Sequence, residues 1–232
     1  MKKALELKRK YLSERDKLFQ TLISTNDGVH FNKNHTNLVD NIVKELVEEI
    51  LEIHPVSDFT LIAVGGYGRR DLSPKSDVDL LFIYKKTNKN IRDFITTLNN
   101  SLWDIGLEVG ISFLTIKQAT IDSKKDIKTV TKFVETRYLI GDEDYYGEFV
   151  RSIKILVGKI NPLKICEQKL LELVDRHDFY LGIKSNLEPQ IKEGIGGLRD
   201  IHTIIWISIF IFNVHKLDEL SQINIFTASE VK

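Results

Sequence analysis

The chain has 232 residues, of which 42% are hydrophobic and 28% are charged, so it can bury a sizeable core in one or two domains. Basic and acidic residues both number 33, which argues against a broad positive surface for nucleic acid or an anionic membrane. The single cysteine, Cys166, excludes an intramolecular disulfide, and no signal peptide is expected in the charged residues after Met1. A soluble, cytoplasmic protein is expected.

Two helices are predicted in residues 1–55. Residues 2–23 have a charged helical pattern. The next stretch repeats apolar residues at the i, i+3, i+4 spacing of an amphipathic helix. These residues are Val39, Ile42, Val43, Leu46, Val47, Ile50 and Leu51. The helix should end at His54, because a proline at position 55 disfavours helical geometry in the residue before it.

A glycine turn between two apolar strands is the most informative stretch of the chain. Residues 59–64 form a run of strand length, residues 65–81 read GGYGRRDLSPKSDVDLL, and residues 77–84 predict a second strand. Side chains alternate along a strand, so Asp77 and Asp79 should point the same way. Two neighbouring carboxylates repel each other unless a cation lies between them. Mg²⁺, with phosphate oxygens in its shell, suits this pair.

The same segment contains candidates for binding phosphate. Gly65 and Gly66 permit a tight turn whose backbone N–H groups could face a triphosphate. Positive charge could come from the basic side chains between the glycines and the carboxylates, which are Arg69, Arg70 and Lys75. The arginines could instead pair with acidic side chains on the surface. Ser73 and Ser76 could donate to phosphate, although a structural role in capping is favoured.

The remaining elements are predicted to be mostly helical. A helix is expected near residues 89–105 and a strand near 107–115. From Thr115, a suitable N-cap, the pattern is helical to the end of the chain. Breaks are expected near Gly141, Gly158–Pro162 and Gly182–Gly197. The fold class is therefore α+β: helices over 1–55, a core of strands and helices over 56–122, and a helical domain over 123–232. The longest apolar run, residues 204–212, is too short to cross a bilayer and is predicted to be a buried helix.

Three segments, in chain order, resemble one enzyme family. The glycine pair followed by the two aspartates resembles the signature of the nucleotidyltransferase superfamily. Residues 65–81 are similar to the N-terminal domain of the bifunctional PII-protein uridylyltransferases. Residues 102–110, LWDIGLEVG, resemble the strand that leads to that family's third carboxylate, and residues 187–206, LEPQIKEGIGGLRDIHTIIW, resemble a second motif of the family. The resemblance extends over about residues 59–206.

The resemblance implies a fold and an activity. It implies a nucleotidyltransferase-type mixed sheet flanked by helices, followed by a helical domain. It also implies Mg²⁺-dependent transfer of UMP from UTP to a tyrosine of a PII-like signal protein. The process that this transfer would serve is nitrogen regulation. No nucleic acid and no membrane is expected as a partner.

The resemblance also implies roles for individual residues. Asp77 and Asp79 would hold Mg²⁺, and Glu108 is the candidate for the third carboxylate because strand alternation puts it on the polar face. Asp104 is the competing candidate, and Glu108 could also be a simple surface residue. In the helical domain, Lys192 and Arg199 would contact the nucleotide; the alternative is a plain turn and helix start.

Departures from the family pattern leave substrate and activity open. Arg70 stands where the family commonly has glycine, and Ile111 and Leu114 stand where it has histidine and arginine. The alternatives are a non-catalytic, regulatory nucleotide-binding module, or a nucleotidyltransferase with another nucleotide and acceptor. Family members continue into a phosphohydrolase domain and two ACT domains. This sequence ends at Lys232 without them, so we expect only the transferase half: a fragment, a split gene, or an apolar C-terminal helix that meets a partner.

Overall fold

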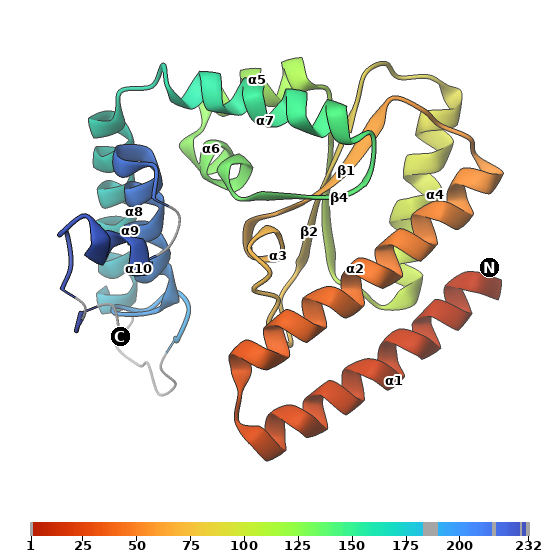
Figure 1. Cartoon of the computed structure of the whole chain (residues 1–232), viewed down its shortest axis with the longest axis horizontal. Coiled ribbons are helices and arrows are strands. Elements are labelled where there is room, and N and C mark those ends of the chain that lie inside the picture. Colours follow the sequence, from red (N-terminus) through yellow and green to blue (C-terminus); the bar gives the residue numbers. More distant parts are fainter. Residues whose placement is uncertain (1, 183–189, 215–216, 228, 231–232) are drawn as a thin grey trace. The chain divides into compact units, whose positions relative to one another are not determined.

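The computed structural model describes residues 2–182, 190–214, 217–227 and 229–230. These residues group into two units, Met1–Lys154 and Ile155–Lys232. In chain order, the elements of the first unit are α1 (Lys2–Thr25), α2 (Gly28–Ile53), β1 (Phe59–Val64), α3 (Gly65–Gly68), β2 (Val78–Tyr84), α4 (Lys89–Ile105), β3 (Val109–Leu114), α5 (Ile116–Lys125), α6 (Ile127–Val134), β4 (Thr136–Gly141) and α7 (Glu143–Val157), within which the division falls (Figure 1).

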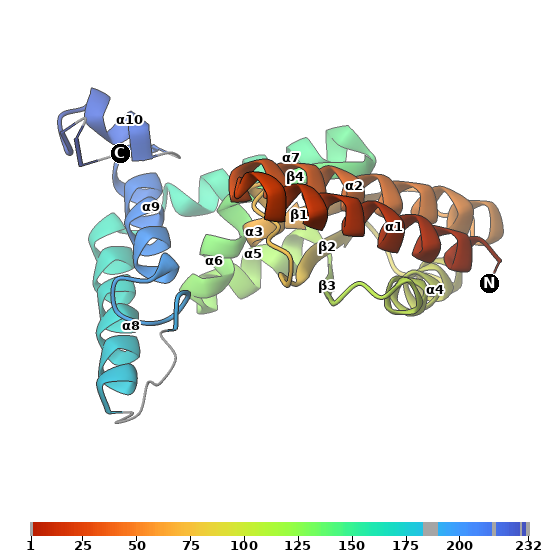
Figure 2. The same cartoon turned by 90° about the horizontal axis from the view of Figure 1, so that it is seen from below.

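Two long helices begin the first unit. Figures 1 and 2 both show α1 and α2 side by side. The carboxylate of Asp27 caps α2 by accepting a hydrogen bond from the backbone N–H of His30. The predicted apolar stripe of α2 is buried except at Leu51, which is partly buried. The helix ends at Ile53 with His54 as its C-cap, so the predicted end before Pro55 is confirmed.

A four-stranded mixed sheet, in the order β3-β2-β1-β4, forms the centre of this unit. β1 is antiparallel to both of its neighbours, and β2 is parallel to β3. Because parallel strands need a crossover, α4 connects β2 to β3. Apolar side chains of α2 and α4 join those of the strands in one core, which includes Val43, Phe82 and Phe94. The predicted α+β fold class is confirmed.

The strand β4 corrects the expectation of helix throughout the region after Thr115. Residues 136–140 read TRYLI and are good strand formers, and they pair with the free edge of β1 from Thr60↔Gly141 to Val64↔Thr136. Pairing with a distant strand outweighs local helical pattern here. The prediction of helix throughout residues 123–232 is therefore wrong at β4. The domain boundaries at residues 55 and 122 stay predictions.

The second unit is helical in its described parts. It contains α8 (Pro162–Gly182), α9 (Leu198–Phe212) and α10 (Leu217–Gln222), and α8 packs against α9. The predicted motif residues 187–189 lie outside the described residues. In α9, Trp206, Ile209 and Phe210 are buried, as predicted for the apolar run, but Ile211 and Phe212 remain exposed. Among the described helices, none is both long and apolar enough to cross a membrane.

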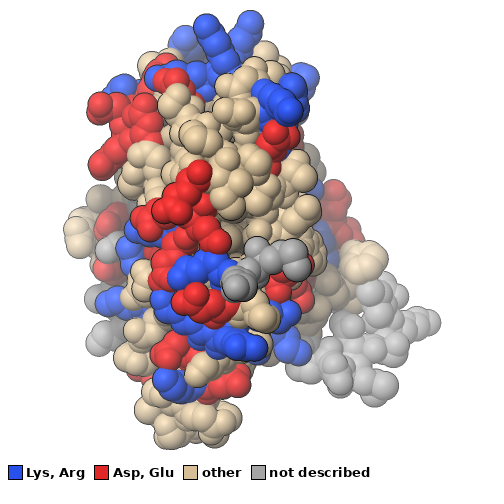
Figure 3. All heavy atoms as spheres, turned by 90° about the vertical axis from the view of Figure 1, so that its right-hand side faces the viewer, with Lys and Arg blue, Asp and Glu red and all other residues tan. Residues whose placement is uncertain are grey.

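The surface charges are mixed on the face drawn in Figure 3. Side chains of Lys and Arg lie interspersed with those of Asp and Glu there. This pattern agrees with the equal numbers of basic and acidic residues in the chain.

Candidate functional site

The two aspartates and Glu108 line one hollow on the sheet. Asp79 lies in β2, and Asp77 directly precedes that strand. The backbone N–H of Val78 donates to the carbonyl oxygen of Glu108 at 2.7 Å, and the register places Asp79 opposite Gly110 of β3. Neighbours in register share a face of a sheet. Asp77 and Asp79 both line the hollow, so they point to the same side as strand alternation predicts.

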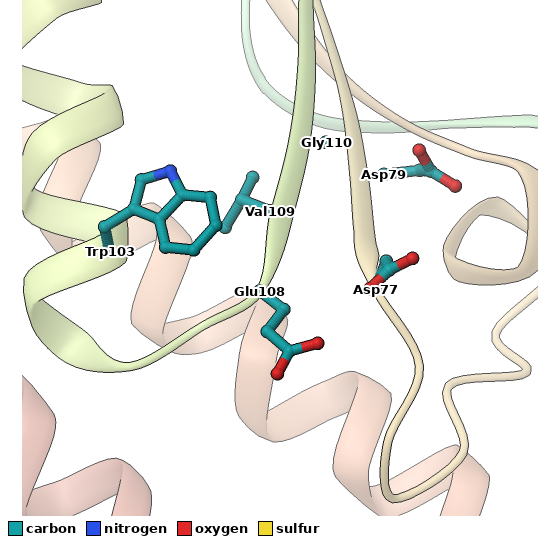
Figure 4. A pocket seen from close by; sticks show the side chains of 6 residues that line it. All are labelled: Asp77, Asp79, Trp103, Glu108, Val109 and Gly110. Atoms are coloured by element: carbon teal, nitrogen blue, oxygen red, sulfur yellow. The ribbon is translucent and has the colours of Figure 1, made fainter.

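The hollow has a volume of about 320 Å³. Figure 4 shows the carboxyl groups of Asp77 and Asp79 on one side of β2, with Glu108 below them. Trp103 and Val109 also line the hollow, and Trp103, at the end of α4, is 56% exposed. The competing candidate Asp104 does not line this hollow.

Two glycines make room for the carboxylate of Asp79. A Cβ at Gly110 would lie 3.0 Å from the Oδ1 atom of Asp79, and a Cβ at Gly65 would lie 3.6 Å from its Oδ2 atom. Gly65 also has a φ of 59°, in the left-handed region that glycine adopts at low cost. Its N–H donates to the carbonyl oxygen of Glu135 at 3.1 Å. The N–H of Gly65 therefore already has a hydrogen-bond acceptor within the protein. Gly66 is the next residue of α3.

A lysine that the sequence did not point to contacts the same carboxylate. The Nζ atom of Lys132, in α6, donates to Oδ1 of Asp79 at 3.0 Å. The two residues lie 53 positions apart, so no local pattern could have linked them. The oxygen of Asp79 therefore already stabilises one positive charge of the protein.

The carboxylates fit a hard divalent cation in their chemistry. Asp77 and Asp79 offer oxygen donors in one open hollow, and such donors are the ones that Mg²⁺ prefers. Within the part of the chain that the structure describes, no three Asp, Glu, His or Cys side chains gather closely enough to hold a metal ion. The assignment of Glu108 as a third ligand thus stays a prediction.

The two arginines after the glycine turn are held by other parts of the first unit. The guanidinium of Arg69 pairs with the carboxylate of Glu135 at 2.5 Å, and the side chain of Glu135 is only 5% exposed. Arg70, with a φ of 64°, donates to the side-chain oxygen of Asn37 in α2 at 2.9 Å. Contact with phosphate, as predicted for both arginines, would require each to leave its present partner.

The loop between α3 and β2 is fixed by its own hydrogen bonds. The hydroxyl of Ser76 accepts from the N–H of Ser73 at 3.1 Å, which is a structural role within the loop and not the predicted capping of a helix. Leu72 is fully buried, and its carbonyl oxygen lies 3.1 Å from the Nδ1 atom of His35. Burial lowers the pKa of His35, which favours the neutral ring. Lys75 is exposed on this loop, so its amine is accessible.

An ion pair between Arg137 and the buried Asp40 holds the backbone of the glycine turn. Arg137 of β4 donates to both carboxylate oxygens of Asp40 at 2.7 and 3.0 Å, and to the carbonyl oxygen of Tyr67 at 3.2 Å. Tyr67 is buried, and this burial raises its pKa well above the usual value. At Gly68, an added Cβ would lie 2.3 Å from the carbonyl oxygen of Glu135, so only glycine fits there. These contacts could not be predicted from local sequence patterns, because Asp40 and Arg137 lie 97 positions apart.

In the second unit, the predicted nucleotide contacts lie in or near a tightly bonded turn. Arg199 pairs with Glu193 at 3.0 Å and lies over the Trp206 ring, whereas Lys192 is exposed. Asp200 accepts hydrogen bonds from the N–H of Gly196 and from two side chains of α8, Arg176 and His177. Burial raises the pKa of Asp200, but these hydrogen bonds outweigh it and hold the pKa below its usual value. The turn-and-helix alternative is realised here, and nucleotide contact stays a prediction.

Two family models match the chain. Residues 43–143 match the model described as "Nucleotidyltransferase domain", and residues 164–232 match the model described as "GlnD PII-uridylyltransferase". The first match contains the glycine turn, Asp77, Asp79 and Glu108. The second match begins in α8 and contains Lys192 and Arg199.

Curated proteins with significant similarity have one recurring name, bifunctional uridylyltransferase/uridylyl-removing enzyme. The protein from Rhodospirillum rubrum is 34% identical over 96% of this chain and 24% of its own length. The protein from Chromobacterium violaceum is 38% identical over 74% of this chain and 20% of its own length. The protein from Rhodopseudomonas palustris is 36% identical over 75% and 19%, respectively. The chain therefore spans about a quarter or less of the length of these relatives.

Proposed function

This chain is related to the bifunctional uridylyltransferase/uridylyl-removing enzymes and contains a nucleotidyltransferase domain, and we propose that it transfers UMP from UTP to a tyrosine of a PII-like protein with Mg²⁺ as cofactor. The observation that carries this proposal is the hollow that Asp77, Asp79 and Glu108 line beside the glycine turn. We expect the reaction in the cytoplasm, where nucleoside triphosphates are supplied.

The aspartate pair would hold the cofactor. When bound, Mg²⁺ would neutralise charge on the triphosphate and favour ionisation of the attacking hydroxyl. Asp77 and Asp79 have the hard oxygen donors required, and the glycines at 65 and 110 leave the carboxylate of Asp79 accessible on two sides.

Glu108 would handle the proton of the acceptor. In the proposed step, the tyrosine oxygen forms a bond to the α-phosphorus, the bond from that phosphorus to the pyrophosphate oxygen breaks, and the tyrosine proton passes to Glu108. Its exposed position at the rim of the hollow, directly before β3, supports this role.

Phosphate contacts are proposed from both units. In the first unit, Gly66 and the accessible Lys75 are the proposed contacts that need the least rearrangement. Ser76 is partly buried and already bonded to Ser73, and Gly65, Arg69 and Arg70 would have to exchange a present partner. In the second unit, the proposed contacts are Lys192 and Arg199.

Transfer of label from α-labelled nucleotide tests the proposal. Purified chain, a PII-like protein and Mg²⁺ are incubated with α-labelled UTP and, separately, ATP, CTP and GTP. Label on the acceptor from UTP is expected, and its loss in Asp77→Asn and Asp79→Asn would tie transfer to the carboxylates. Asp58→Asn is the matched control, because Asp58 pairs with Lys85 at the far end of β1 and its φ of 58° suits asparagine.

Two other functions would give different results in the same assay. Label from another nucleotide would indicate a nucleotidyltransferase with a different substrate. Nucleotide binding without transfer to any acceptor would favour the regulatory module, which the replacements at Ile111 and Leu114 in β3 support. Full transfer by Asp77→Asn would overturn the role of this carboxylate.

A further inference from the structure

Lys132 is placed at the proposed metal site by a helix with a defined start and a buried face. The carboxylate of Asp126 caps α6 by accepting from the N–H groups of Lys128 and Thr129. Val130 and Phe133 of the same helix are buried, and the ring of Phe133 packs edge-on against another phenylalanine of the first unit. The contact with Asp79 is therefore made from a packed helix.

The carboxylate of Asp79 already has one cation of the protein as its neighbour. Gly110 flanks its Oδ1 atom, Gly65 flanks its Oδ2 atom, and the Nζ atom of Lys132 lies 3.0 Å from Oδ1. An ammonium at this distance weakens the attraction of the carboxylate for any further positive charge. The side chains of Lys132 and Asp79 are 34% and 39% exposed, so the amine can leave Asp79 without being buried.

We propose that Lys132 couples the binding of a divalent cation to the binding of nucleotide. Without nucleotide, its amine is the counter-ion of Asp79 and opposes metal binding. With nucleotide in the hollow, the amine leaves Asp79 and donates to a phosphate oxygen of the triphosphate, which carries more negative charge than one carboxylate. Metal and nucleotide then favour each other's binding. This inference rests on the proposed function, because it takes a triphosphate as the ligand of the hollow.

Binding measurements test the coupling without reference to turnover. The affinity for Mn²⁺ is measured from the electron paramagnetic resonance signal of free Mn²⁺, with and without a UTP analogue that has a methylene group between the α- and β-phosphorus atoms. Metal bound by the analogue in solution is subtracted. In the unaltered chain, the analogue is expected to raise the affinity for Mn²⁺ at the protein, and the reciprocal effect on nucleotide affinity must be of equal size.

Three variants of α6 separate the contact from general charge. In Lys132→Met, the affinity for Mn²⁺ alone should rise about threefold to tenfold, and the gain produced by the analogue should shrink by a similar factor. Lys132→Arg keeps the charge and should keep most of the coupling. Lys128→Met removes an equal charge from an exposed position of the same helix and should change neither value.

The outcomes distinguish this inference from the proposed reaction. Unaltered coupling in Lys132→Met would overturn the inference while leaving UMP transfer intact, and so would an equal effect of Lys128→Met. Reduced coupling in Lys132→Met, together with no transfer of UMP to any acceptor, would support the inference and count against the proposed reaction. Absence of Mn²⁺ binding in both the unaltered chain and Lys132→Met would overturn the inference.

Discussion

Arg69 and Glu135 form an ion pair at 2.5 Å in which the carboxylate is almost completely buried. The backbone of Glu135 also accepts the N–H of Gly65, so this residue holds both ends of the glycine turn. The pair joins the turn to the start of β4. It therefore has a structural role whether or not Arg69 also contacts a nucleotide.

Replacing Arg69 should destabilise the fold. Arg69→Met would leave the buried carboxylate of Glu135 without its guanidinium, and we expect a loss of about 2 kcal/mol in the free energy of unfolding. Urea denaturation measures this loss, and the double variant Arg69→Met/Glu135→Gln should recover part of it. Unchanged stability combined with weaker nucleotide binding would instead assign Arg69 to phosphate.

A methyl group at residue 110 should disturb the proposed metal site. The Cβ of Gly110→Ala would lie 3.0 Å from Oδ1 of Asp79 and would push that carboxylate aside. We expect the affinity for Mn²⁺ to fall about tenfold, equivalent to about 1.4 kcal/mol, with little change in stability. Gly28→Ala is the matched control, since its Cβ would meet no atom within 4 Å. Equal metal affinity in the two variants would show that Asp79 is not a ligand.

The ion pair of Asp40 and Arg137 should tolerate neither the loss of the arginine nor its exchange for lysine. Arg137→Met would leave Asp40 buried and unpaired, at a cost of about 3 kcal/mol in unfolding free energy. Arg137→Lys should restore only part of this, because lysine cannot donate to both oxygens of Asp40 and to Tyr67 in one plane. Thermal and urea unfolding measure both variants. Full stability of the lysine variant would show that charge alone suffices.

Acid should weaken the turn that begins α9. The folded-state pKa of Asp200 lies below its usual value, so its contribution to stability is present above the unfolded-state pKa of about 3.9 and is lost as the pH falls through the folded-state pKa. At pH 7, Asp200→Asn should lower the free energy of unfolding by about 1 to 2 kcal/mol. Urea denaturation from pH 7 to pH 3 should show the difference between the two proteins shrinking below about pH 4. A difference that stays constant over this range would contradict the lowered pKa of Asp200.

The parts of the fold that were predictable depend on neighbours in sequence. The stripe of α2, the extent of α4 and the strands on either side of the glycine turn follow from local periodicity, and the structure confirms them. Strand alternation also placed Asp77 and Asp79 on one face. These features could be read because each depends on spacings of a few residues.

The parts that were missed depend on pairing between distant segments. Local pattern favoured helix at β4, which is a strand because β1 offers it a free edge. Lys132 of α6 contacts Asp79, and Glu135, which directly precedes β4, contacts Arg69; these partners lie 53 and 66 positions away along the chain. No spacing within the sequence encodes such contacts.

The central position of β1 limits how far the chain could be shortened. Its two neighbours are β2 and β4, and the second of these is completed only at Gly141, more than 70 residues after β1. A protein synthesised without residues 136–141 would expose one side of β1 as a row of unpaired backbone groups, open to pairing with other chains. It would also lack the arginine that anchors Asp40 and Tyr67. The smallest piece that could keep the carboxylates in place therefore extends past the strand that sequence periodicity had assigned to a helix.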